Sequence, residues 1–225
     1  MASTIVWPLE VLPPREIMAE IAPRSLAGPS SISGVTQVVA TDAGIWKVSF
    51  VGVPVVDQQK VLAWRGINSI LEGRMTPVIV PLSRWYQPVP DGQDHLYGPV
   101  PHSDSSPFSD GSKYQGQVID VTLASNVPVR GTTATIDINN AGLIQPGQRF
   151  SIGERLYQVK TISYSSDEQA TITFRPPARE AASIGDRLNF DFPVCKMRLV
   201  SDSSMDMGLD YGRWSFPTVS FIEDV

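Results

Sequence analysis

The feature that most constrains the fold of this chain is a series of short stretches in which apolar and polar residues alternate. A turn ends each stretch. In residues 155–164 and 170–175 apolar side chains recur with a period near two, and the polar run 165–167 separates the two stretches. Successive side chains of a β-strand point to opposite faces of its sheet, so this pattern predicts two half-buried strands joined by a polar turn. Nineteen prolines and seventeen glycines punctuate the chain with reversals. These features favour short strands and long loops, and hence a mainly β fold.

Composition and charge exclude several classes of protein. With 225 residues, 42% hydrophobic and 18% charged, the chain is long enough for one or two domains with a real core. Its formal net charge of -5 disfavours specific nucleic-acid binding, because contacts to phosphate need clustered lysine and arginine. Residues 1–20 lack the basic start and apolar run of a signal peptide, and no segment approaches about 18 uninterrupted apolar residues. We therefore expect synthesis in the cytoplasm and no membrane insertion.

The N-terminal part combines a proline-rich arm with a hairpin. Residues up to about Arg24 contain four prolines, each of which removes a backbone donor, so this arm is expected to be an edge strand or a tail laid on a neighbour. The next segment is predicted to be a hairpin with strands Thr36–Ala40 and Ile45–Val51 and a turn at 41–44. In its second strand three side chains share one face and are expected in the core: Trp46, Val48 and Phe50.

Residues 57–72 are the one segment with a convincing helical pattern. Five apolar residues follow helical spacing: Val61, Trp64, Ile67, Ile70 and Leu71. Asp57 is placed to cap the helix N-terminus and Gly73 to end the helix. Gly66 weakens the helix by up to about 1 kcal/mol relative to alanine, so packing has to hold it. A single amphipathic helix among strands is expected to cover the open face of a sheet.

Changes in composition along the chain predict a split domain with an insertion. Residues 1–84 are expected to form a β domain with one helix, completed by strands within 193–225. Residues 85–116 are rich in Pro, Gly, Ser and Asp and are predicted to be a long loop or linker. Residues 117–192 are predicted to be an inserted β module. The expected strands of the module are Gln117–Leu123, Thr133–Ile138, Arg149–Ile152, Arg155–Tyr164, Ala170–Phe174 and Asp186–Phe192.

The predicted fold class is therefore mainly β: a split β-sandwich or barrel domain with one helix, plus an inserted small β-barrel or sandwich module. Outside the module we expect a very short or edge strand at Met75–Leu82, bounded by prolines, and strands at Cys195–Val200 and Arg213–Ile222. The last two have no partner nearby in the sequence, so they are expected to rejoin the sheet of the first domain.

The sequence offers no residues for catalysis, cofactors or metals. His95 and His102 lie near Asp91, Asp94 and Asp104 in a polar loop, where such side chains are usually solvated, since no rigid element holds them as ligands. The chain has no G-x-S-x-G nucleophile motif and no phosphate-binding glycine motif. Cys195 is the only cysteine, so no internal disulfide can form, and we expect a buried apolar thiol there. We expect no enzymatic activity and no cofactor.

Four aromatic residues in the polar loop are the candidate protein-interface residues: Trp85, Tyr86, Tyr97 and Phe108. Tryptophan and tyrosine contribute large contact areas at low entropic cost, which suits a partner contact. The same side chains could instead anchor the loop on its own domain. The sequence leaves both interpretations open.

Several segments, taken in order, resemble minor tail proteins of tailed bacteriophages, and most closely the distal tail (baseplate hub) type. These segments are SLAGPSSISGVTQVVATDAGIWKVSF, VLAWRGINSILEG, QPGQRFSIGERLYQV, ATITFRPPARE and WSFPTVSFIEDV. The most specific part is SIGERLYQV followed about ten residues later by TITFRPPARE. The resemblance covers most of the chain. It lies in the order and the general residue pattern of these segments more than in an invariant motif.

The resemblance implies a structural virion protein made in the host cytoplasm. It implies a split β domain with an inserted module, and assembly into a homo-oligomeric ring, six-fold or three-fold, at the distal end of a tail tube. The ring would connect the tube, hub and fibre proteins of the tail, and no catalytic residue is carried over. The loop at 83–116 departs from the family in length. The alternatives are a carbohydrate-binding module, with Trp85, Tyr86 and Tyr97 stacked on sugars, and a tail-associated hydrolase.

Overall fold

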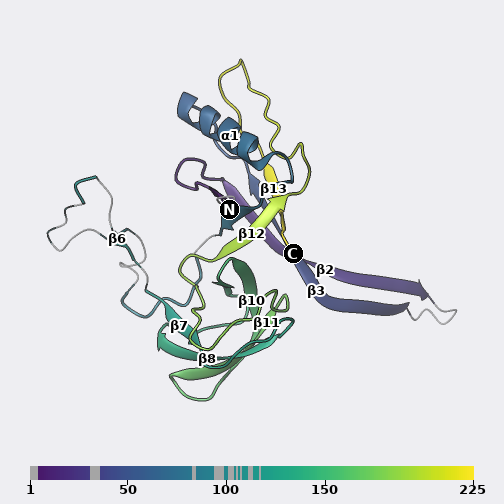
Figure 1. The fold of residues 1–225 in the computed structure, drawn as a ribbon, viewed down its shortest axis with the longest axis vertical. Coiled ribbons are helices and arrows are strands. Elements are labelled where there is room, and N and C mark those ends of the chain that lie inside the picture. The colour runs from purple at the N-terminus through teal and green to yellow at the C-terminus, as the bar shows by residue number, and fades with distance from the viewer. Residues whose placement is uncertain are drawn as a thin grey trace. The chain divides into compact units, whose positions relative to one another are not determined.

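The structure is a computed structural model, and it describes residues 5–30, 36–82, 85–93, 99–100, 104, 106, 108–110, 114–116 and 118–225. The chain divides into two compact units. Unit 1 comprises Met1–Ser83 with Val194–Val225, and unit 2 comprises Arg84–Pro193. Strands dominate both units and α1 (Gln58–Leu71) is the α-helix of the described residues, which confirms the mainly β fold class with one helix (Figure 1).

Unit 1 is built on one six-stranded sheet with the order β1-β4-β12-β13-β3-β2. All neighbouring strands are antiparallel except β1 and β4, which are parallel. The strands are β1 (Ile5–Val6), β2 (Glu16–Ser30), β3 (Thr36–Val51), β4 (Val78–Pro81), β12 (Val194–Leu199) and β13 (Val219–Glu223).

Strands from both ends of the chain thus lie side by side in this sheet. β12 and β13 pair with each other and lie between β4 and β3. At one end of the β4–β12 ladder, Pro81 is paired with Val194. The chain therefore leaves unit 1 after β4 and returns at β12 from a neighbouring position in the same sheet.

Aromatic side chains form the centre of the unit 1 core. Trp7 packs edge to face against Phe50 of β3, Phe221 of β13 and Trp64 of α1, with ring centroids 5.4–5.8 Å apart. Edge-to-face pairs of this kind add to the free energy gained by burying the rings. Because Trp64 meets the sheet residues through Trp7, α1 covers this face of the sheet, as its amphipathic pattern predicts.

The helix begins and ends close to the predicted residues. The Lys60 backbone N–H donates to Asp57 Oδ1 at 2.8 Å, and this hydrogen bond is the main reason that the pKa of the Asp57 carboxyl is lowered. Glu72 then adopts a left-handed conformation with φ of 46° and ends the helix. Of the predicted apolar face, three residues are buried: Trp64, Ile67 and Leu71. Placing Ile70 on that face was wrong, because it lies beyond the arc that the sheet covers and is exposed.

The predicted turn at Thr41–Gly44 was also wrong, because β3 runs through it without reversing. Its partner is β2, which lies at the edge of the sheet, as predicted for the proline-rich arm. Ala22 pairs with Ile45 and Arg24 with Thr41, so three residues of β3 oppose the single residue Pro23. Proline has no N–H for the ladder, and the turn-forming residues are used as a bulge opposite it.

Unit 2 contains a five-stranded antiparallel sheet with the order β7-β8-β11-β10-β9. Its strands are β7 (Asp120–Leu123), β8 (Thr133–Asn140), β9 (Arg149–Ile152), β10 (Arg155–Tyr164) and β11 (Gln169–Arg175). A separate two-stranded pair consists of β5 (Pro99–Val100) and β6 (Tyr114–Gln115).

The five-stranded sheet curls into a small barrel. Arg187 bridges to Thr122 of β7, and Asn189 bridges to Ser151 of β9, so one segment joins both edges of the sheet. The predicted strand Asp186–Phe192 is thus realised as isolated bridges. Likewise the predicted strand Arg213–Ile222 begins only at Val219, as β13 (Val219–Glu223), because Pro217 interrupts the segment before it.

The barrel encloses its own apolar core. Four rings lie in contact at centroid distances of 5.1–5.9 Å: Phe150, Tyr157, Phe174 and Phe190. Where the barrel closes, the buried Asp191 carboxylate accepts the backbone N–H groups of Val118 and Ile119 at 3.1 Å. Its other oxygen lies 3.5 Å from Arg187 Nη2. This carboxylate ties the start of the barrel to its closing segment.

Within the described residues, no helix has the length and hydropathy needed to cross a membrane.

Candidate interaction surfaces

Three of the four candidate aromatic residues lie in the described part of the chain. Trp85 is 77% exposed and Tyr86 is 93% exposed, whereas Phe108 is 37% exposed. Tyr97, with His95 and His102, lies outside the described residues. Trp85 and Tyr86 therefore present most of their surface to solvent.

The segment that carries these two residues is fixed to the barrel of unit 2. The Gly142 N–H donates to the carbonyl of Pro88 at 2.8 Å, and the Gln148 side chain donates to the carbonyl of Tyr86 at 3.2 Å. A side chain at Gly142 would collide with the carbonyl oxygen of Val89, so glycine is needed for this close approach. Tyr86 has a φ of 67°, a conformation that residues other than glycine seldom adopt.

Next to this segment lies an open hollow of about 450 Å³ in unit 2. Three sets of residues line it: Val89, Pro90 and Asp91; Ile138, Ala141, Gly142 and Leu143; and Tyr164 and Asp167. The Tyr164 hydroxyl bonds to both the N–H and the carbonyl of Ile144, at 2.8 and 3.0 Å, which fixes its ring. The hollow thus combines apolar side chains, a fixed tyrosine and two carboxylates.

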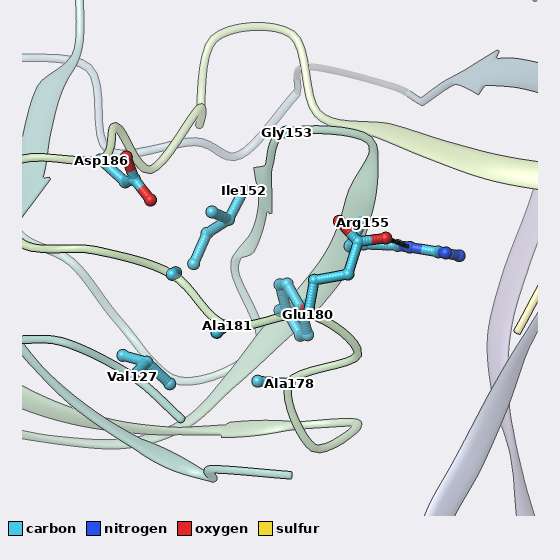
Figure 2. A pocket seen from close by; sticks show the side chains of 10 residues that line it. Val127, Ile152, Gly153, Arg155, Ala178, Glu180, Ala181 and Asp186 are labelled. Atoms are coloured by element: carbon cyan, nitrogen blue, oxygen red, sulfur yellow. Dashed lines mark hydrogen bonds and ion pairs between the residues drawn. The ribbon is translucent and has the colours of Figure 1, made fainter. Parts of the chain in front are cut away.

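A smaller pocket of about 170 Å³, lined by a different set of residues, also lies in unit 2 (Figure 2). Arg155 and Glu180 line it and pair with each other at 2.8 Å between Nε and Oε1. Asp186 accepts the backbone N–H of Ser183 at 2.7 Å, and the Tyr157 hydroxyl accepts that of Arg179 at 3.1 Å. Because these polar groups already bond to neighbouring groups of the barrel, we assign no chemistry to this pocket.

Unit 1 has an aromatic surface that sequence reasoning missed. Residues 210–214 form a tight hairpin in which Asp210 and Trp214 pair and Tyr211, at its tip, is 90% exposed. The Tyr211 and Trp214 rings lie 5.8 Å apart. A hollow of about 440 Å³ separates this hairpin from α1, with Leu62, Arg65 and Arg213 among its lining residues. The sequence signal is the tight-turn pattern Asp-Tyr-Gly-Arg-Trp, whose last two residues belong to the predicted strand Arg213–Ile222.

The β2–β3 hairpin extends beyond the rest of the sheet in unit 1 (Figure 1). β13 pairs with β3 only at residues 47–50. At the end of that ladder the Glu223 carboxylate accepts the Trp46 N–H at 3.1 Å. From the pair Ala22–Ile45 outward, β2 and β3 are paired with each other and with no other named strand of the described residues. We call this part, residues 22–30 and 36–45, the hairpin arm.

Two further findings bear on chemistry. Cys195 is buried, as predicted. The part of the chain that the structure describes holds no group of three or more His, Cys, Asp or Glu side chains arranged to bind a metal ion.

No protein-family model matches the chain, and no curated protein matches it.

Proposed function

We propose that this chain is a structural subunit that assembles with copies of itself into a ring, and that the ring belongs to the distal end of a phage tail. The sequence resemblance to distal tail proteins supports the location in a virion. The hairpin arm supports the assembly, and it is the observation on which the proposal chiefly rests.

The arm has the properties of an element completed by another molecule. A two-stranded hairpin is marginally stable in water at best, and fixing each residue of its backbone costs roughly 1–2 kcal/mol of entropy. Arg24 and Asp42 are the only charged residues in the arm, so little charge protects its open strand edge from pairing. Pairing with a neighbouring copy satisfies these backbone groups and offsets the entropy cost.

Such a contact joins two different surfaces, since the arm of one copy meets another part of the next. Contacts of this heterologous type close into a ring when the rotation between neighbours divides a full turn. A ring at the end of a tube requires this geometry. The Tyr211–Trp214 surface of unit 1 and the barrel of unit 2 then remain for contacts with hub and fibre proteins.

Shortening the arm tests the proposal. Replacing residues 25–40 by Asn-Gly joins Arg24 to Thr41, which already face each other in the ladder. We expect sedimentation velocity to show a closed oligomer for the full chain and a monomer for the shortened variant. The melting temperature of unit 1 should be retained, because the removed residues lie beyond the β13–β3 ladder.

The matched control is Trp85→Ala, which alters an exposed aromatic residue of unit 2 and should leave the oligomer intact. An unaltered oligomer in the arm-shortened variant would refute the role of the arm. A full chain that stays monomeric at high concentration would refute the proposed assembly.

A further inference from the structure

The aromatic pair of unit 2, Trp85 and Tyr86, is exposed on a segment that is fixed to the barrel. Pro88 is the buried residue of the segment, whereas Trp85 and Tyr86 expose most of their surface. Three side-chain or backbone hydrogen bonds hold the segment at Tyr86, Pro88 and Gln93, the last at 3.2 Å from Asn140 Nδ2. Burying apolar rings is favourable, so a fixed segment that holds two rings in solvent indicates a binding surface.

The left-handed backbone conformation of Tyr86 is a second indication of a binding surface. Left-handed geometry costs a residue with a side chain roughly 1–2 kcal/mol. The Gln148 hydrogen bond to the Tyr86 carbonyl helps to hold this geometry. Strained residues of this kind cluster at ligand-binding sites.

The hollow beside the segment determines which ligand fits. Its side chains offer apolar contact through Val89, Pro90 and Leu143, and hydrogen-bond acceptors through Asp91 and Asp167. Ionised carboxylates accept hydrogen bonds from hydroxyl groups and repel phosphate, sulfate and other anions. The hollow is open and shallow in polar surroundings, so it does not enclose an apolar molecule as a buried pocket does.

We infer that this surface, made of Trp85, Tyr86 and the hollow lined by Asp91, Tyr164 and Asp167, binds neutral oligosaccharides. Sugar rings have apolar C–H faces that stack on Trp85 and Tyr86, and hydroxyl edges that donate to the two carboxylates. The aromatic pair and the hollow belong to one segment, since Val89, Pro90 and Asp91, which follow Tyr86 in the sequence, line the hollow. All of its residues lie in unit 2, whereas the hairpin arm lies in unit 1, so separate variants test this inference and the ring proposed above.

The first test screens the full chain against an array of neutral and anionic oligosaccharides and titrates the best binder by isothermal calorimetry. We expect neutral oligosaccharides to bind. Trp85→Ala and Tyr86→Ala should each weaken binding about tenfold, the loss expected for one stacking contact. Asp91→Asn and Asp167→Asn should weaken it severalfold.

The matched control is Tyr211→Ala, which removes an equally exposed aromatic residue from unit 1 and should leave the affinity unchanged. Melting temperatures confirm that each variant is folded. If Trp85→Ala fails to fold, the two aspartate variants decide the question alone.

Three outcomes would overturn the inference: no oligosaccharide binds, only anionic sugars bind, or binding is unaffected by the Trp85, Tyr86 and aspartate variants. Sedimentation velocity of the same variants shows whether each still forms the proposed oligomer. A loss of sugar binding can then be distinguished from a loss of assembly.

Discussion

Single glycines set how closely segments approach each other in both units. Gly142 lets the 85–93 segment lie against the barrel, because a side chain there would collide with the Val89 carbonyl. Gly44 is one of the bulged residues of β3, and a side chain there would collide with Ile21 of β2. Gly73 follows the helix with a φ of 66°, and a Cβ there would lie 2.7 Å from Asp202 Oδ1. Each glycine therefore permits a contact between segments that are distant in sequence.

Gly73 gives a residue-scale prediction with an internal control. Gly73→Ala should destabilise the chain by about 1–2 kcal/mol, because alanine resists the left-handed conformation and crowds Asp202. Gly66→Ala should raise stability by up to about 1 kcal/mol, because Gly66 lies inside α1 with open space around it. Urea unfolding of both variants measures the two changes. Equal stability of the Gly73 variant and the parent chain would contradict the account.

At the scale of elements, the barrel depends on a segment that is not itself a strand. Residues 186–189 join β7 and β9 through hydrogen bonds from Leu188 N–H to the Val121 carbonyl at 2.9 Å and between Ser151 and Asn189. Asp191, just after them, holds the N–H groups of Val118 and Ile119. One buried carboxylate thus links the two ends of the barrel sequence.

Removing that carboxylate should open the barrel. Asp191→Ala leaves two buried backbone donors unpaired and removes a partner of Arg187, which should cost about 3 kcal/mol or more. Amide hydrogen exchange should then increase most along β7 and at residues 186–189. Asp167→Ala, an exposed carboxylate in a turn, is the control and should be neutral. Exchange that rises evenly across both units would contradict a local role for Asp191.

The elements differ in how far the sequence predicts them. Local pattern placed β9 and β10 at the observed residues, and Asp57 marked the start of the helix, because alternation and capping act within a few residues. The bulge at 42–44 was missed, since the residues 41–44 are those of a turn and only Pro23 on the partner strand explains why they form a bulge. The exposure of Ile70 was missed because it depends on the width of the face that the sheet covers.

The candidate surfaces were predictable only in part. Composition singled out Trp85 and Tyr86, but their exposure depends on distant contacts from Gly142 and Gln148. The Tyr211–Trp214 surface was not found, because its hairpin and the neighbouring helix α1 are separated by more than a hundred residues.

At the scale of the whole molecule, the chain path suggests two independently folding units. Pro81 and Val194 face each other in the β4–β12 ladder, so a short turn can replace everything between them. The apolar cluster of the barrel is made of residues from unit 2. Each unit therefore contains the contacts that stabilise it.

Separating the units should leave both folded. A chain in which a short Asn/Gly turn replaces residues 83–193 should unfold cooperatively, and so should the fragment 84–193, because each keeps its own core. Circular dichroism melts and dispersed amide NMR spectra of the two proteins check this. A fragment 84–193 that lacks a cooperative transition would show that the barrel depends on unit 1.

Ring assembly through the hairpin arm is the central claim, and images of the purified full chain test it most directly. Negative-stain electron microscopy should show closed rings of uniform size with rotational symmetry, since every copy carries the same arm and the same receiving surface. Scattered single subunits at high concentration, or open filaments of variable length, would contradict the claim.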